Sequence, residues 1–186
     1  MKIAKKSKTA HLKFPKSPTG IQGLDEITSG GLPKNRITLL AGGTGCGKTL
    51  MAMEFLVKGV TEFGEPGVFV SFEEKRDELL VNSRSLGLNL NSLVVKNKIY
   101  VDNIEVNQSK IVEAGSYDLE GLFVRLKLGI SKVNAKRVVL DSLDILFYSL
   151  DYGTLRSEFV RLFSWLKEKK VTAVVTAEKG DTFLTR

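Results

Sequence analysis

Short apolar runs alternate along this chain with longer segments in which apolar residues recur at helical spacing. The runs are rich in Val, Ile and Leu, and most of them lack the polar alternation of a half-exposed strand. Such runs are typical of parallel strands that helices cover on both faces. The pattern therefore predicts five strands, at residues 37–41, 68–72, 99–102, 138–140 and 171–175.

The segments between these strands predict helices. Apolar residues at i, i+3, i+4 and i+7 predict a helix over residues 118–133, with Asp118 near its N-terminus, and another over residues 155–166. Residues 48–63 and 76–86 are also predicted to be helical, whereas the polar link before the third strand receives no assignment. We therefore expect an α/β fold, a three-layer α-β-α sandwich with a mainly parallel sheet that binds ligands at the carboxyl ends of its strands.

The first strand runs into Gly42-Gly43-Thr44-Gly45-Cys46-Gly47-Lys48-Thr49, which matches the pattern G-x-x-x-x-G-K-[S/T] at every fixed position. A strand before the motif and a helix after it separate a phosphate-binding loop from a chance match. The glycines let phosphates approach backbone N–H groups, and the helix N-terminus adds further donors. We expect Lys48 to contact the β- and γ-phosphates of ATP and the Thr49 hydroxyl to ligate Mg²⁺.

The fourth strand ends in an acid. Val138-Val139-Leu140-Asp141 has the apolar-strand-then-Asp pattern of a Walker B motif, which places Asp141 where it can hold Mg²⁺. Ser142 and Asp144 follow, and Asp144 is also a candidate to cap the next segment. Downstream of a complete phosphate-binding loop, this pattern makes Asp141 the expected second metal ligand.

Two glutamates, Glu73 and Glu74, end the second strand at the same edge of the sheet. One of these carboxylates could orient and deprotonate the water that attacks the γ-phosphate. Adjacent acids at a helix start also interact favourably with the helix dipole, without any catalytic role. The residues alone leave these two interpretations open.

Length and cysteine count restrict the class of protein. A chain of 186 residues fits one domain. Cys46 is its only cysteine, so no internal disulfide can form, and this favours a reducing compartment. No apolar run approaches the ~20 residues of a membrane span. We therefore expect a cytoplasmic protein that does not contact a membrane.

The positive charge is concentrated at the N-terminus. Residues 1–16 carry six lysines and no acid, which supplies +6 of the formal net charge of +7, and the only histidine, His11, lies among them. A basic arm can contact nucleic acid, but a frayed, solvated terminus has the same composition. We expect a basic flexible tail over residues 1–16 and an ATPase domain over residues 17–186, with nucleic-acid binding confined to the tail if it occurs.

Several further motifs occur in a fixed order along the chain. These motifs are Gly20-Ile21-x-Gly23-Leu24-Asp25, Gly30-Gly31-Leu32-Pro33, Gly45-x-Gly47-Lys48-Thr49-Leu50 and Glu65-Pro66-Gly67-Val68-Phe69-Val70-x-Phe72-Glu73-Glu74. Together with further matching motifs toward the C-terminus, the likeness covers residues 19–178. The chain thus resembles the KaiC family, which belongs with the RecA and RadA recombinases, and in particular the first ATPase domain of its members.

This resemblance implies a RecA-like P-loop fold that self-associates into a hexameric ring, with ATP and Mg²⁺ at the subunit interfaces. Glu73 and Glu74 match the paired glutamates that act as the hydrolytic base in the family. Thr49 matches its Mg²⁺ ligand. Leu50 and Ser85 match further nucleotide-binding positions, with Ser85 near the nucleoside.

Two departures from the family pattern are visible. Asn35 stands where the family usually has Gly, and Asn also tolerates the left-handed backbone conformation. The sequence stops at Arg186, about ten residues past the fifth strand, whereas the family continues with strands that close the sheet and with basic residues that reach a neighbouring subunit. The sheet is therefore expected to lack its C-terminal strands, and no kinase activity is implied.

Three functions fit these observations. The first is a KaiC-like ATPase that works as a slow switch or an assembly motor. The second is a recombinase-type DNA-binding ATPase, but residues 138–155 contain three Asp and no Lys or Arg, which argues against a DNA-binding loop there. The third is a regulatory homologue that binds nucleotide without turnover.

Overall fold

A computed structural model of the protein describes residues 14–104, 119–144 and 152–179. Its centre is a five-stranded parallel sheet with the strand order β3-β7-β6-β4-β5. The strands are β3 Ile37–Gly42, β4 Gly67–Ser71, β5 Ile99–Asn103, β6 Arg137–Asp141 and β7 Thr172–Glu178. All of them lie where the apolar runs predict strands, so the parallel sheet is confirmed.

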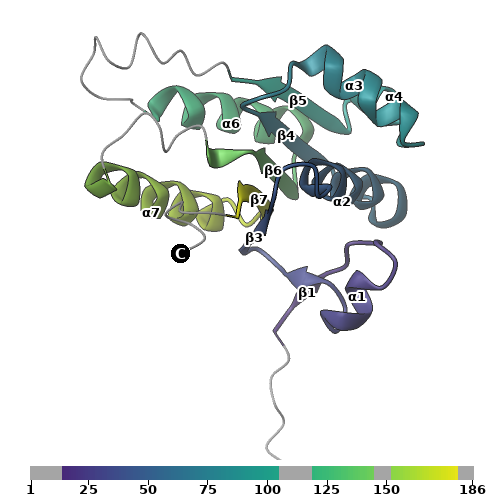
Figure 1. Ribbon diagram of the computed structural model, residues 1–186, viewed down its shortest axis with the longest axis horizontal. Coiled ribbons are helices and arrows are strands. Elements are labelled where there is room, and N and C mark those ends of the chain that lie inside the picture. Colours follow the sequence, from purple (N-terminus) through teal and green to yellow (C-terminus); the bar gives the residue numbers. More distant parts are fainter. Residues whose placement is uncertain (1–13, 105–118, 145–151, 180–186) are drawn as a thin grey trace, which may run out of the picture.

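Helices cover both faces of this sheet (Figure 1). One face packs against α2 Lys48–Phe63, α3 Arg76–Ser85 and α4 Leu90–Val95, and the other packs against α6 Glu120–Val133 and α7 Tyr152–Glu168. Side chains of β6 alternate between these faces, because Val138 and Leu140 are buried with α6 and α7 whereas Val139 is buried with α2. This arrangement confirms the three-layer α-β-α sandwich.

Two details differ from the expectation. Helix α4 lies in the link that received no assignment, where Leu90 and Leu93 are buried and the Asn89 side chain caps the first turn. A helix of six residues is too short to show a clear apolar period. Helix α6 begins at Glu120, and the expected N-terminal residue Asp118 lies outside the described residues.

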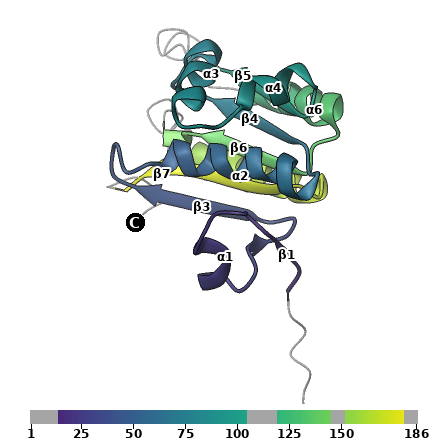
Figure 2. The ribbon, with the colours of Figure 1, turned by 90° about the vertical axis from the view of Figure 1, so that its right-hand side faces the viewer.

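A small antiparallel strand pair precedes the main sheet. β1 Lys16–Ser17 pairs with β2 Leu32–Pro33, and α1 Leu24–Ile27 lies between them in sequence and beside β3 in space (Figure 2). The boundary at residue 16 therefore needs correction, because Lys16 pairs with β2 instead of belonging to a tail. After β2, Asn35 has a φ of 56°, which is the left-handed conformation expected at this position.

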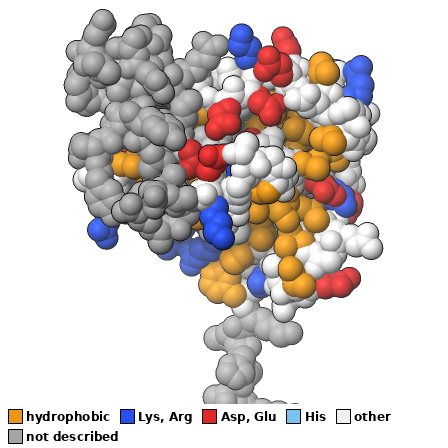
Figure 3. Space-filling view, in the orientation of Figure 1, with side chains coloured by type: hydrophobic (Ala, Val, Ile, Leu, Met, Phe, Trp, Pro, Cys, Tyr) orange, Lys and Arg blue, Asp and Glu red, His pale blue; other side chains and the backbone are white. Residues whose placement is uncertain are grey.

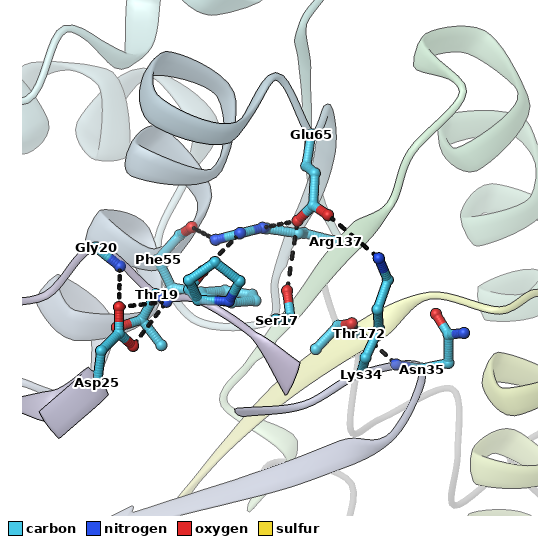
Figure 4. A network of polar contacts seen from close by, with 11 residues as sticks. Ser17, Thr19, Gly20, Asp25, Lys34, Asn35, Phe55, Glu65, Arg137 and Thr172 are labelled. Carbon is cyan, nitrogen blue, oxygen red and sulfur yellow. Dashed lines mark hydrogen bonds and ion pairs between the residues drawn. The ribbon is translucent and has the colours of Figure 1, made fainter. Parts of the chain in front are cut away.

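The amino end of the sheet contains a fully buried arginine, Arg137 of β6 (Figure 4). Its guanidinium donates to the Glu65 carboxylate at 2.8 Å and to the backbone oxygens of Phe55 at 2.8 Å and Pro18 at 2.7 Å. Gly59 makes room for the Arg137 side chain, since a Cβ there would lie 2.5–2.9 Å from its Cδ, Nε and Cζ atoms. Arg137 thus ties the N-terminal strand pair, through Pro18, to α2 and the main sheet.

Candidate functional site

The loop between β3 and α2 lies at the carboxyl end of the sheet (Figure 2). Gly45 and Gly47 have positive φ angles of 74° and 90°, which other residues rarely adopt. No atom of the described residues lies within 4 Å of the position that a Cβ would take at either residue. At Gly42, a Cβ would collide with the Cys46 Sγ. The geometry therefore explains three of the glycines and leaves open space beside the loop.

The N-terminus of α2 faces this space. Gly47 occupies the N-cap position, no side chain of the described residues caps the helix, and its first turn contains no acid. The backbone N–H groups of the first turn and the positive end of the helix dipole are thus available to an anion. Lys48 Nζ donates to the backbone oxygens of Gly42 at 3.0 Å and Gly43 at 2.9 Å, so its ammonium lies over the loop.

Asp141 lies buried at the carboxyl end of β6, next to the loop. Burial raises the pKa of its carboxyl group, while hydrogen bonds from Thr176 and Thr49 and the charge of Lys48 act to lower it. Nearby Asp144 raises this pKa further. The structure thus brings together Thr49 and Asp141, the two residues that the sequence suggests as Mg²⁺ ligands.

Glu73 and Glu74 follow β4 and point to different neighbours. Partial burial raises the pKa of the Glu73 carboxyl, a hydrogen bond with the Ser142 side chain lowers it, and the charges of Asp141, Asp144 and Glu178 raise it. Glu74 instead accepts a hydrogen bond from Asn82 Nδ2 of α3 at 3.1 Å. Only Glu73, therefore, interacts with the acids at the ends of β6 and β7.

A second set of contacts connects the ends of β6 and β7 with the loop. Asp144 Oδ2 accepts hydrogen bonds from Ser142 Oγ at 2.8 Å and from the backbone N–H of Glu178 at 2.5 Å. Thr44 of the loop donates to Glu178 Oε1 at 2.5 Å. Asp144 therefore joins the ends of β6 and β7, and the segment that it was expected to cap lies outside the described residues.

A pocket of about 440 Å³ opens between the loop, α2 and α3. Its lining includes two residues expected at the nucleotide, Leu50 and Ser85, together with Glu74 and the loop residues Gly45, Gly47, Lys48 and Thr49. Sequence reasoning missed three further lining residues, Met53, Asn82 and Leu86. Asn82 could have been found, because it lies three residues before Ser85 and so on the same face of α3.

Figure 3 looks onto the carboxyl ends of the strands, where acidic side chains gather close to an apolar area. In the part of the chain that the structure describes, no group of three or more His, Cys, Asp or Glu side chains could hold a metal ion by itself. Mg²⁺ commonly takes only one or two protein carboxylates, with substrate phosphates and water completing its shell. Thr49 and Asp141 therefore fit Mg²⁺ that arrives with a nucleotide.

None of the helices in residues 14–104, 119–144 and 152–179 is long and apolar enough to cross a membrane.

The chain is similar to clock ATPases along nearly its whole length. A family model described as "ATPase: KaiC" matches residues 17–184. The chain is 56% identical to the circadian clock protein KaiC2 of a Synechocystis species, and the match covers 94% of this chain and 31% of that protein. It is 42% identical to the circadian clock oscillator protein KaiC of Prochlorococcus marinus, covering 94% and 35% of the two chains. The chain thus spans about a third of the length of these curated relatives.

Proposed function

The chain belongs to the KaiC family of ATPases, which supports a RecA-like, ATP-binding function, and we propose that its site binds ATP with Mg²⁺ and hydrolyses the ATP slowly. The observation that carries the proposal is the position of the Thr49 side chain near Asp141, where it lowers the pKa of this acid and so brings the phosphate-binding loop next to the buried carboxylate of β6. A hydroxyl and a carboxylate from these two elements are the ligands that P-loop enzymes offer to Mg²⁺.

The phosphates would bind to the backbone N–H groups of residues 42–49 and to the first turn of α2. The glycines support this assignment, because the space beside Gly45 and Gly47 is open to a ligand. Lys48 currently donates to two carbonyl oxygens of its own loop. Its long side chain can exchange these neutral acceptors for the β- and γ-phosphates, which are charged and so form stronger hydrogen bonds.

The metal would be held by Thr49 directly and by Asp141 through water. When bound, Mg²⁺ would neutralise the negative charge that develops on the phosphate oxygens during hydrolysis. The raised pKa of Asp141 supports this assignment, because burial disfavours the charged carboxylate even though the charge of Lys48 lowers this pKa. A divalent cation beside it would compensate the charge that burial disfavours.

Glu73 would act as the base that takes a proton from the attacking water. A carboxylate with a raised pKa is a better proton acceptor than an ordinary one, and Glu73 has such a pKa because of partial burial and neighbouring acids. Glu74 lines the nucleotide pocket and is held by Asn82, so we assign it a supporting role in the same step. Leu50 and Ser85 would contact the nucleotide from α2 and α3.

The proposal also covers what the protein does beyond ATP hydrolysis at this site. We propose that the protein acts in the cytoplasm as a switch or an assembly ATPase and self-associates, as the resemblance to the ring-forming KaiC ATPases implies. DNA binding by the described domain is not part of this proposal, because the acidic carboxyl end offers little attraction to nucleic-acid phosphates. The activities of the longer relatives are carried over only as far as this one site.

The test compares single-turnover Mg²⁺-ATP hydrolysis and ATP affinity in the unchanged chain, Glu73→Gln, Glu74→Gln, the double variant and the control Glu26→Gln, which lies on exposed α1. General bases contribute roughly 10²- to 10⁴-fold, so we expect a loss of that order in Glu73→Gln, a smaller loss in Glu74→Gln, and unchanged ATP affinity in both.

Other outcomes would favour the other functions. Tight ATP binding without any turnover in the unchanged chain would indicate a regulatory homologue. Hydrolysis that depends on added single-stranded DNA would indicate a recombinase. Hydrolysis that the double variant retains in full would refute the assignment of the base.

A further inference from the structure

Contacts at the ends of β6 and β7 converge on Asp144, a buried residue to which the proposed function assigns no role. Its Oδ2 atom accepts one hydrogen bond from the Ser142 hydroxyl at 2.8 Å and another from the Glu178 backbone N–H at 2.5 Å. Ser142 directly follows β6 and Glu178 is the last residue of β7. One carboxylate therefore holds the ends of two adjacent strands together.

Each of the two donors has a second contact that leads into the candidate site. The Ser142 side chain also lies near enough to Glu73, the proposed base, to lower the pKa of the Glu73 carboxyl. The Glu178 carboxylate accepts a hydrogen bond from Thr44 of the phosphate-binding loop at 2.5 Å. Asp144 is thus the middle member of a chain of contacts that runs from Glu73 to Thr44.

The Ser142 hydroxyl is the sensitive point in this chain. A serine hydroxyl has one proton to donate, and both Asp144 and Glu73 are acceptors when they are ionised. In the structure the hydroxyl donates to Asp144, so this residue decides how the hydroxyl is oriented beside Glu73. The carboxylate of Asp144 also contributes to the raised pKa of Glu73.

Packing alone does not explain an acid at this place. Asp144 Oδ1 is buried and has no hydrogen-bond partner among the described residues. Buried polar atoms without partners are few in native proteins, because their desolvation is not compensated. An apolar side chain of similar size would avoid that penalty, so the contacts of Oδ2 need a reason other than stability.

We propose that Asp144 is a positioning residue for ATP hydrolysis, which fixes the Ser142 hydroxyl beside the base Glu73 and fixes the Glu178 backbone beside the loop. This inference rests on the proposed function, because it requires Glu73 to act on the attacking water. Asp144 does not itself line the 440 Å³ nucleotide pocket. Its loss should therefore lower the rate of hydrolysis and leave ATP affinity nearly unchanged.

The experiment measures single-turnover hydrolysis of Mg²⁺-ATP and binding of a fluorescent ATP analogue in the unchanged chain and in Asp144→Ala, Asp144→Asn and Asp102→Asn. Misplacing a reacting group by about 1 Å can cost roughly 100-fold, so Asp144→Ala should lower the rate constant by about 10- to 100-fold and change the Kd by less than about threefold. Asp144→Asn keeps an acceptor oxygen and should recover most of the rate.

Asp102 is the matched control, because it is also a buried, hydrogen-bonded aspartate at the end of a strand, but it pairs with Arg125 away from the loop. Its variant should hydrolyse ATP like the unchanged chain. Equal losses in Asp144→Ala and Asp102→Asn would show a general effect of removing a buried carboxylate and would overturn the inference. If Asp144→Ala does not fold, Asp144→Val, which fills the same space, replaces it in the comparison.

Ser142→Ala and the double variant with Asp144→Ala test the route of the effect. If Asp144 acts through Ser142, removing Asp144 should lower the rate by less than about threefold when Ser142 is already absent. Full additivity would overturn the inference. Hydrolysis that is present and insensitive to Asp144 would overturn the inference alone, whereas no hydrolysis by the unchanged chain would overturn the proposed function as well.

Discussion

The two ends of β6 each bury a charged residue in opposite surroundings. At the amino end, Arg137 donates three hydrogen bonds and lies over the rings of Phe55 and Phe63, 4.5 and 5.3 Å from their centroids. At the carboxyl end, Asp141 has a pKa raised by burial and lies close to Asp144, which keeps an oxygen without a partner. The charge of Arg137 is compensated within the fold, whereas the contacts of Asp141 do not outweigh its burial.

Acids at the two ends show the same contrast. Burial raises the pKa of Asp25, which lies near the amino end. Hydrogen bonds from the backbone and side chain of Thr19 and from the backbone of Gly20 together lower this pKa by more than burial raises it, so the net shift is downward. At the carboxyl end, the same kinds of contact do not outweigh burial for Asp141, and its net shift is upward. The contacts of Asp25 at one end of the sheet thus favour its charged form, whereas burial disfavours the charged form of Asp141 at the end where we propose the binding site.

The largest expected effect is the loss of Arg137. Arg137→Met removes the ion pair with Glu65 and leaves the backbone oxygens of Phe55 and Pro18 without their donor. Breaking a buried pair typically costs about 3–5 kcal/mol, and we expect a loss of that order in the free energy of unfolding. Chemical denaturation measures it. ATP affinity of the folded variant should not change, and a weakened affinity would show that the two ends are coupled.

The second largest effect is expected on ATP affinity, at the carboxyl end of the sheet. Lys48→Ala removes the ammonium that we expect on the phosphates, so ATP affinity should fall at least ~100-fold, which corresponds to about 2.7 kcal/mol. Stability should change by less than about 1 kcal/mol, because the hydrogen bonds of Lys48 among the described residues go to backbone oxygens of a surface loop. Calorimetric titration with Mg²⁺-ATP measures the affinity. An unchanged Kd would refute the assignment of the phosphate-binding loop.

A third prediction compares Asp25→Asn with Asp141→Asn in the absence of nucleotide and metal. The lowered pKa of Asp25 stabilises the fold above the ordinary value of 3.8, and this stabilisation disappears as pH falls through the lowered pKa. The raised pKa of Asp141 has the opposite sign, because stability decreases as pH rises from 3.8 through the raised pKa. At pH 7, Asp25→Asn should lose about 1 kcal/mol, whereas Asp141→Asn should lose nothing or gain stability.

Unfolding curves at several pH values measure both variants. The Asp141→Asn protein should show a flatter dependence on pH above 3.8 than the unchanged chain. An unchanged dependence above 3.8, together with a flatter one below 3.8, would mean that the contacts of Asp141 outweigh its burial. It would remove the contrast between the two ends.

The smallest expected effect is at the N-terminus. Deleting residues 1–13 should change the melting temperature by no more than a few degrees, because this lysine-rich arm offers little apolar area to bury. Deleting residues 1–17 is the matched comparison, since it also removes β1 and the side chain of Ser17, which donates to Glu65. The second deletion should destabilise the protein clearly more than the first. Equal effects would show that the arm itself docks on the fold.

The parts of the molecule that depend on local sequence were predictable. The strands, the long helices and the phosphate-binding loop each have a signal within a few residues, and the structure confirms these elements. The Arg137 cluster has no such signal, because its partners lie 72, 82 and 119 residues away in sequence. The burial of Arg137, the first residue of an apolar strand, therefore could not be predicted from the sequence.

The division of work between Glu73 and Glu74 was also beyond the sequence. Both residues follow the same strand, and only the folded chain shows that Glu73 interacts with Ser142 whereas Glu74 interacts with Asn82. The link between Asp144 and Glu178 is equally non-local, since it depends on β6 and β7 lying side by side. Site residues that act through neighbouring strands become visible only when the sheet order is known.

The most direct test of the account is thermal unfolding with and without Mg²⁺-ATP in the unchanged chain, Lys48→Ala and Gly59→Ala. Gly59→Ala crowds the buried Arg137 and should lower the melting temperature without touching the site. A ligand that binds only the folded state stabilises it by about 2.7 kcal/mol at 100 times its Kd. The account predicts the same upward shift with Mg²⁺-ATP in the unchanged chain and in Gly59→Ala, and no shift in Lys48→Ala. An equal shift in all three proteins would contradict it.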